Sequence, residues 1–261
     1  MMEAKNKVTL IKVGGKVVEN EETLDHLLTS FSQITGYKAL IHGGGRLATQ
    51  IAEKLGVETQ MIDGRRITSD EMLDVVTMVY GGLVNKKIVA ALQAKKVNAL
   101  GLTGADLNCI LSAKRPVKEI DYGWAGDVKK VEGEMLSDLI RKGIVPVMAP
   151  LTHDGNGHML NTNADTIAGE LAKALAPHFE VTLVYCFEME GVLRSVEDSS
   201  SVIDRLDYAS FQAYVKEGII EGGMIPKLDN AFEAIDSGVR EVIITKSTLI
   251  NDLTKGTHIL A

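Results

Sequence analysis

Two glycine clusters in the sequence could bring the backbone close to a bound anion. Gly14 and Gly15 end an apolar run, and Gly43, Gly44 and Gly45 stand between an apolar run and an amphipathic stretch. Backbone N–H groups at the start of a helix point outward and carry partial positive charge, so such junctions bind anions. One glycine would be enough for a tight turn, whereas three together indicate the close approach of a ligand. These glycines therefore predict a site for phosphate or carboxylate groups.

Three charged residues could complete such a site. Lys12 lies inside an apolar run, where a buried ammonium group needs a partner. Lys227 follows a proline in the first turn of a predicted helix, where its charge opposes the helix dipole unless an anion binds there. Asp165 lies with Asn161 and Asn163 in "NTNAD", of which a helix cap needs only one residue. Two lysines with an aspartate between them would serve phosphoryl transfer, which depends on positioning and charge neutralisation.

The sequence lacks one of the two standard phosphate-binding motifs and matches the spacing of the other. The P-loop pattern does not occur in the sequence. Gly43, Gly45 and Ala48 have the G-x-G-x-x-A spacing of a dinucleotide site, with Asp63 roughly in range of a ribose. A dinucleotide-dependent oxidoreductase therefore remains an alternative, although it leaves both lysines without a function.

The composition limits the classes of partner. The 261 residues suit one large α/β domain or two modest lobes. A net charge of −7 disfavours nucleic acid and anionic membranes as partners. No apolar stretch approaches the ~20 residues of a membrane helix, and the charged start "MMEAKNK" is unlike a signal peptide. Cys109 and Cys186 have no metal-ligand spacing, so we expect free thiols in a cytoplasmic protein.

Short apolar runs alternate with amphipathic stretches along the chain. The runs predict buried strands at 8–13, 37–42, 97–102, 144–150, 181–186 and 240–245. The amphipathic stretches predict helices at 46–56, 68–81, 164–176 and 227–238. Alternation of this kind predicts a mostly parallel sheet with helices on both sides. The segments 107–117 and 122–131 differ, and we interpret them as an inserted β-hairpin.

Two of the predicted helices carry detailed expectations. Helix 46–56 should bury Leu47, Ile51 and Leu55 on one face and end at its final glycine. Helix 68–81 should begin with a capping box formed by Thr68 and Glu71. The same helix should bury three apolar residues, namely Met72, Val76 and Val79.

The ordered set of motifs resembles the amino-acid kinase superfamily, and within it the N-acetylglutamate kinases. The resemblance covers nearly the whole chain and is carried by "IKVGGK", "IHGGG", "GRRIT", "VNKKIV", "YGWAGDV", "PVMAPL", "LNTNADTIA", "GGMIPK" and "GTHIL". It implies ATP-dependent phosphorylation of the γ-carboxylate of an N-acyl-L-glutamate, N-acetyl or N-succinyl, in arginine biosynthesis. It also implies a three-layer α/β/α sandwich around a mainly parallel sheet. Residues 1–175 would bind the acyl amino acid and form a homodimer, partly through helix 68–81, and residues 176–261 would bind ATP with its Mg²⁺.

The resemblance also assigns roles to single residues. Lys12 and Lys227 would stabilise the moving phosphoryl group, and Asp165 would orient both lysines. The remaining site residues would bind phosphate (Gly14, Gly15), the substrate (Gly44, Gly45, Arg66, Asn161, Asn163) and the nucleotide (Glu188, Gly191).

Departures from the family pattern keep alternatives open. The nucleotide turn, commonly Asp-Val-x-Gly, is "EMEG" at 188–191, which admits a non-catalytic amino-acid-binding protein. A carbamate or glutamate 5-kinase would share the glycines and lysines. Arg65 replaces an apolar leucine beside Arg66, and its guanidinium could bind the extra carboxylate of a succinyl group.

Overall fold

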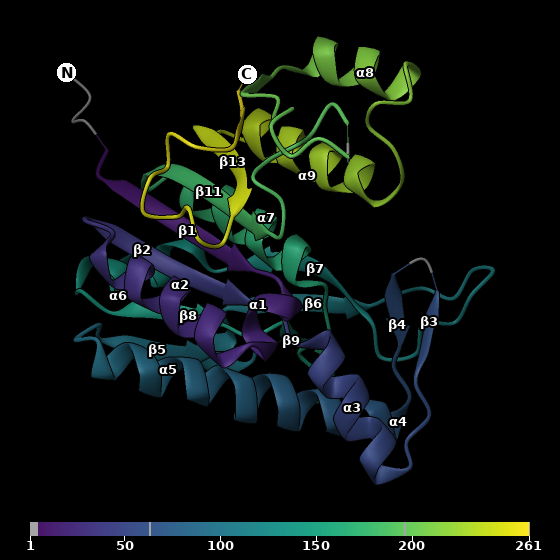
Figure 1. The fold of residues 1–261 in the computed structure, drawn as a ribbon. Coiled ribbons are helices and arrows are strands. Elements are labelled where there is room, and N and C mark those ends of the chain that lie inside the picture. The colour runs from purple at the N-terminus through teal and green to yellow at the C-terminus, as the bar shows by residue number, and fades with distance from the viewer. Residues whose placement is uncertain (1–4, 63, 196, 261) are drawn as a thin grey trace.

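The computed structural model describes residues 5–62, 64–195 and 197–260, and its largest element is an eight-stranded sheet (Figure 1). The strand order is β12-β14-β13-β11-β1-β2-β8-β5, and only β14 runs antiparallel to a neighbour, β13. The bounds are β1 Lys7–Val13, β2 Tyr37–His42, β5 Ala99–Leu102, β8 Val145–Met148, β11 Glu180–Phe187, β12 Arg205–Leu206, β13 Glu241–Lys246 and β14 Thr257–Ile259. All six predicted strands are confirmed, with small differences at their ends. The proposed halves 1–175 and 176–261 meet where β1 pairs with β11, inside one continuous sheet.

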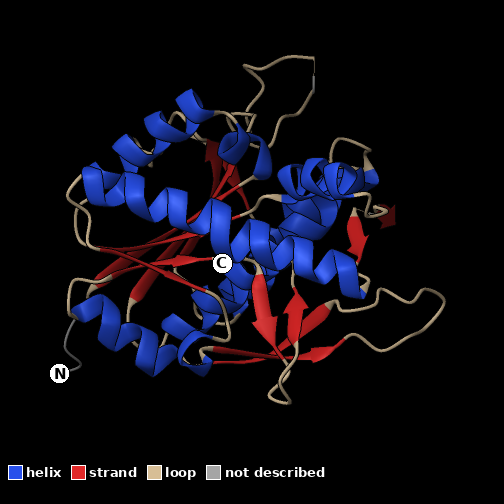
Figure 2. Cartoon of the chain, turned by 90° about the horizontal axis from the view of Figure 1, so that it is seen from below, coloured by secondary structure: helices blue, strands red, loops and turns tan. Residues whose placement is uncertain are grey.

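Helices cover both faces of this sheet, which confirms the three-layer α/β/α architecture (Figure 2). One core packs under α6, α7, α8 and α9, and the other packs under α1 to α5. The bounds are α1 Gly15–Glu19, α2 Glu21–Gln33, α3 Gly45–Leu55, α4 Asp70–Val76, α5 Asn85–Ala94, α6 Gly133–Arg141, α7 Ala164–Leu175, α8 Tyr208–Lys216 and α9 Ile225–Asp236. Short 3-10 turns lie at Asp106–Asn108 and Gly222–Met224.

Side chains along β1 point alternately to the two faces of the sheet, and this alternation determines the face on which Lys12 lies. Val8 and Leu10 point into the core under α7 and α9, whereas Ile11 and Val13 point into the other core. Since side chains alternate along a strand, Lys12 shares the face of Leu10. The helices above that face carry Asp165 and Lys227.

The predicted hairpin is present as β6 (Ile110–Lys114) and β7 (Gly126–Val131), which pair antiparallel. It is not an isolated insertion, because β9 (Leu151–His153) and β10 (Met159–Asn161) extend it to a four-stranded sheet. A further pair, β3 (Gln60–Ile62) and β4 (Arg65–Ile67), was not expected. Strands of three residues are too short to show an alternating pattern.

Helix 68–81 is the first part of a longer helix, Asp70–Ala94. It comprises α4, a π-helical segment η1 (Thr77–Val84) and α5. Met72, Val76 and Val79 are buried as expected. The predicted capping box is wrong by one residue, because Ser69 accepts from the Met72 N–H and Thr68 is buried.

By length and composition, the helix Asp70–Ala94 is apolar enough to cross a membrane, with a mean hydropathy of 1.4 over its best window. The expectation that no stretch approaches this size is therefore wrong. Asp74, Lys86 and Lys87 lie within this helix and divide its apolar residues into shorter runs. About half of that window, 44%, is buried inside this structure.

The expected apolar face of helix 46–56 is also wrong. In α3, Ala48 and Ala52 are fully buried, and Leu55 is 58% exposed. Leu47 and Ile51 lie at the margin of the core. Small side chains face inward because α3 packs closely against α1 and α4. The helix ends at Gly56 in the left-handed conformation, φ +73°, as expected.

Candidate active site

The two glycine loops face each other at the carboxyl ends of the adjacent strands β1 and β2. The Gly43 N–H donates to Val13 O at 3.0 Å, and a Cβ atom on Gly43 would lie 3.3 Å from the Gly15 nitrogen. A Cβ atom on Gly44 would lie 3.1 Å from the Tyr80 ring, and the φ of Gly44 is +157°. In the part of the chain that the structure describes, the N–H groups of Gly44 and Gly45 have no hydrogen-bond acceptor. The loop of residues 43–45 therefore offers free donors, and their binding to phosphate or carboxylate stays a prediction.

Asp165 lies between the two predicted lysines. Its Oδ1 is 2.6 Å from Lys12 Nζ, and its Oδ2 accepts from Lys227 Nζ at 2.9 Å. The side chains of Lys12 and Asp165 are 8% and 13% exposed. Burial alone would raise the pKa of Asp165, but the charges and hydrogen bonds of the two lysines outweigh it and hold the pKa below its usual value. One positive charge remains in excess, which favours an anion beside the pair.

A cavity of about 640 Å³ opens next to this cluster and receives residues from both halves of the chain. Seven of the predicted site residues line it: Gly44, Gly45, Arg66, Asn161, Asn163, Asp165 and Lys227. Lys12, Gly14 and Gly15 do not line the cavity. Lys12 reaches it through Asp165, and Gly15 lies against the Gly44 loop.

Arg66 is a buried cation at the wall of this cavity. It is 9% exposed, and its Nη2 donates to Gly45 O at 2.7 Å and to Thr49 Oγ1 at 2.9 Å. Among the described residues, it forms no ion pair with a carboxylate. An unpaired buried charge is costly, so the site favours an anionic ligand near Arg66.

The two asparagines have different roles in the structure. Asn163 caps α7, because its side-chain oxygen accepts from the N–H groups of Asp165 and Thr166 at 2.7 and 3.1 Å. The side-chain nitrogen of Asn161 donates to Thr68 Oγ1 at 3.0 Å. The helix-capping interpretation is therefore correct for Asn163, whose oxygen is committed to the backbone.

Glu188 and Gly191, the residues assigned to the nucleotide, do not line the cavity. Glu188 is exposed and pairs with Lys16. A Cβ atom on Gly191 would lie 2.7 Å from Thr257 Oγ1 and 2.8 Å from Val202 Cγ1, so close packing requires glycine there. Their contact with a nucleotide stays a prediction. Asp63, the ribose candidate of the dinucleotide motif, lies outside the described residues.

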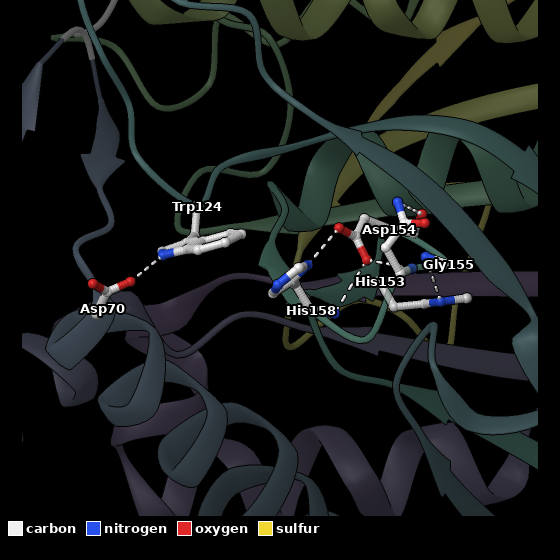
Figure 3. Close-up of polar contacts among 7 residues, drawn as sticks. Asp70, Trp124, His153, Asp154, Gly155 and His158 are labelled. Carbon is white, nitrogen blue, oxygen red and sulfur yellow. Dashed lines mark hydrogen bonds and ion pairs between the residues drawn. The ribbon is translucent and has the colours of Figure 1, made fainter.

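Trp124 holds the segment Tyr122–Gly126 that forms one wall of the cavity. The Trp124 N–H donates to Thr68 O, and the Trp124 carbonyl oxygen accepts from the Asn161 N–H, each at 2.8 Å. Its indole N–H donates to Asp70, and its ring stacks on His158 at 5.0 Å between centroids (Figure 3). The outer side of the wall is therefore fixed by α4 and by the loop between β9 and β10.

Several further cavity residues were missed by sequence reasoning. The side chains concerned are Tyr80, Arg115, Tyr122, Thr166 and Asn230. Arg115 and Tyr122 flank the predicted hairpin turn, and Asn230 follows Lys227 by three residues on α9, so helical spacing was the available signal. Tyr80 has no such signal, because its position depends on the π-helical segment.

The chain is similar to known proteins over nearly its whole length. The acetylglutamate kinase of Bacteroides fragilis (strain ATCC 25285) is 66% identical over 247 residues, 95% of either chain. The acetylglutamate kinase of Methanopyrus kandleri is 39% identical over 240 residues, 90% of this chain and 94% of the relative.

Solved structures share the fold. A Streptococcus mutans protein, smu.665, superposes with a TM-score of 0.79 at 25% identity, over 97% of this chain and 98% of that one. A Giardia lamblia carbamate kinase bound to AMP-PNP gives a TM-score of 0.71 at 15% identity, over 100% and 99% of the two chains. The sequence pattern of the amino acid kinase family matches residues 7–246. With this match and these relatives, the chain belongs to the amino acid kinase family.

Proposed function

We propose that the protein phosphorylates the γ-carboxylate of an N-acyl-L-glutamate with ATP, in arginine biosynthesis. The observation that carries this proposal is Asp165 bound by Lys12 and Lys227, near Gly44 and Gly45, whose N–H groups have no acceptor among the described residues. A carboxylate oxygen would attack the γ-phosphorus while the bond from that phosphorus to the β,γ-bridging oxygen breaks. The products are an acyl phosphate and ADP. The lysines and the glycine N–H groups would stabilise charge on the moving phosphoryl group.

The substrate would lie in the cavity on the N-terminal side. Arg66 would pair with the α-carboxylate, since it is buried and no carboxylate of the described residues forms an ion pair with it. Asn161 would add an amide donor. The nucleotide would lie toward residues 176–261, beyond Lys227. Its Mg²⁺ would be held by the phosphates, and the described residues contain no group of three metal-binding His, Cys, Asp or Glu side chains.

The assay that tests this function is ADP release by the purified protein. We expect turnover with N-acyl-L-glutamate and none with carbamate or free glutamate. Substrate binding without ADP release would support the non-catalytic alternative instead. Binding of NADH would support the dinucleotide alternative.

A cytoplasmic location is part of the proposal. The reaction consumes ATP, and Cys109 and Cys186 are buried free thiols, as proteins of a reducing compartment have. The helix Asp70–Ala94 buries Met72, Val76 and Val79 in the core, which favours a core helix over a membrane span.

N-Succinyl-L-glutamate is a second candidate substrate, which the position of Arg65 favours. The chain turns at Gly64, φ +72°, and both Arg65 and Arg66 line the cavity. We expect the native enzyme to prefer the succinyl substrate and Arg65→Leu to abolish the preference. A charge-assisted pair with the succinyl carboxylate is worth roughly 1.5–3 kcal/mol, or about ten- to a hundredfold in kcat/KM. The measurement is the ratio of kcat/KM for the succinyl and acetyl substrates.

Arg66→Ala is the matched control for this experiment. It should raise KM for both substrates alike, because the α-carboxylate is common to them and its binding changes little in the transition state. A native preference for the acetyl substrate, or an unchanged ratio in Arg65→Leu, would contradict the role of Arg65.

We propose that two chains form a homodimer through the helix Asp70–Ala94. Met78 and Leu83 are 55% and 39% exposed on its apolar π-helical segment, and exposed apolar patches mark interaction surfaces. Sedimentation equilibrium should give the mass of two 28.2 kDa chains. The double variant Met78→Glu/Leu83→Glu should sediment as a monomer, and a monomeric native protein would refute the dimer.

A further inference from the structure

His42 is a fully buried polar residue directly before the three glycines. It ends β2 and has 0% exposure. Its Nδ1 lies 2.8 Å from the carbonyl oxygen of Gly43, and its Nε2 lies 3.1 Å from Asn85 Nδ2. The ring does not line the cavity, so it would not touch a substrate.

The partners of Asn85 determine where the His42 proton lies. The Asn85 amide nitrogen donates one hydrogen to the carbonyl oxygen of Val147 at 2.9 Å and has a second for His42. Its amide oxygen accepts from Lys86 Nζ at 3.1 Å, which fixes the orientation of the amide. Nε2 of His42 must therefore accept, and in the neutral ring the proton lies on Nδ1. That N–H donates to Gly43 O.

His42 stays neutral in this environment. Burial and, to a smaller extent, the nearby Lys86 charge lower the pKa of its ring to about 4, against the hydrogen bond to Gly43, which raises the pKa. A neutral ring has one N–H group to donate, and the geometry directs it to the glycine loop.

The bond to Gly43 also fixes the next N–H group. The Gly43 carbonyl and the Gly44 N–H belong to one planar trans peptide, so they point in opposite directions. Because His42 holds the carbonyl toward the protein interior, the Gly44 N–H faces away from it, where Gly43, Gly44 and Gly45 line the cavity. Tyr80 and Val84 pack against Gly44 from the helix that also carries Asn85.

We infer that His42 is a positioning residue that, with Asn85, aims the Gly44 N–H at the reacting phosphoryl group. This inference rests on the proposed kinase function. The glycines alone are too flexible to keep the Gly44 N–H in one direction. The buried His42 ring would do so by holding the Gly43 carbonyl.

Two isosteric variants test the inference. The side-chain nitrogen of asparagine occupies the place of histidine Nδ1, so His42→Asn should keep the bond to Gly43 and most of the native kcat. Glutamine instead reaches the place of Nε2, so His42→Gln should leave Gly43 O without its donor. By analogy with a lost oxyanion donor, its kcat should fall on the order of ten- to a hundredfold, with little change in KM for ATP.

The outcomes are distinct. Equal kcat values for the two folded variants would overturn the role of His42. A native protein without any kinase activity would instead refute the proposed function.

A measurement on the native protein covers the case in which a variant does not fold. The ¹⁵N NMR signals of His42 should show a protonated Nδ1 and an unprotonated Nε2, unchanged from about pH 6 to 8. The opposite tautomer, or titration within that range, would overturn the inference whatever the activity of the protein.

Discussion

Replacing Lys12 or Lys227 by methionine is expected to lower kcat by about two to three orders of magnitude, on the order of 3 kcal/mol. Methionine keeps most of the length of the side chain and removes its charge. Both ammonium groups bind Asp165 at the edge of the cavity and would stabilise charge on the phosphoryl group in the transition state. ATP should still bind, because the glycine loops and the remaining lysine are intact. The measurements are kcat from ADP release and the Kd of ATP from calorimetry.

Lys95→Met is the matched control. Lys95 pairs with Asp25 at 2.7 Å, away from the cavity, so its loss should leave kcat unchanged. Near-native turnover in either Lys12→Met or Lys227→Met would remove that lysine from the mechanism.

Asp165→Asn is expected to reduce both stability and turnover. The substitution keeps the shape of the side chain and leaves the buried Lys12 ammonium without a negative partner. Loss of one member of a buried ion pair costs about 3–5 kcal/mol. Turnover should fall as well, since the lysines lose the group that orients them. Denaturant unfolding measures the first effect and ADP release the second.

The pH dependence of stability gives an independent test of Asp165. Its pKa is lower in the folded protein than in the unfolded chain. Its contribution is therefore fully present above the ordinary pKa of about 4 and is lost as the pH falls through the lowered value. In Asp165→Asn, the free energy of unfolding should therefore fall less steeply at acid pH than in the native protein.

A double variant separates the buried charge from the chemistry. Lys12→Met/Asp165→Leu removes both charges and should regain stability relative to Asp165→Asn without regaining activity. A native unfolding midpoint in Asp165→Asn would show that the buried pair is not stabilising.

The strands and the charged centre of the site were predictable from the sequence because each has a local signal. Continuous apolar runs mark buried strands, and the lysine in "TLIKVGG" stands out against its apolar neighbours. The meeting of Lys12, Asp165 and Lys227 was inferred from their charges, and the resemblance then assigned their roles, since no local pattern joins residues so far apart. The structure adds the reason, which is the alternation of β1 beneath α7 and α9.

Other parts of the site depend on packing and left no such signal. Tyr80 reaches Gly44 because the helix Asp70–Ala94 is π-helical over Thr77–Val84, and the wider turn changes which side chains face inward. The inward face of α3 consists of alanines, because the close packing of three helices selects small residues over the leucines that a hydrophobic pattern emphasises. The short strand β4, which carries Arg65 and Arg66, and its partner β3 were also missed.

The central position of β1 has a consequence for how the chain is made. β1 is synthesised before the other strands of its sheet, and one of its neighbours, β11, begins only at Glu180. Protein synthesis adds about 5–20 residues per second, so β11 follows β1 after roughly 10 to 35 seconds. During this time the backbone groups on the edge of β1 that later pairs with β11 are unpaired. Such an edge can recruit strands of other nascent chains, and a lysine on it opposes this pairing. Lys12 would therefore act twice, first against aggregation of the unfinished chain and later in phosphoryl transfer.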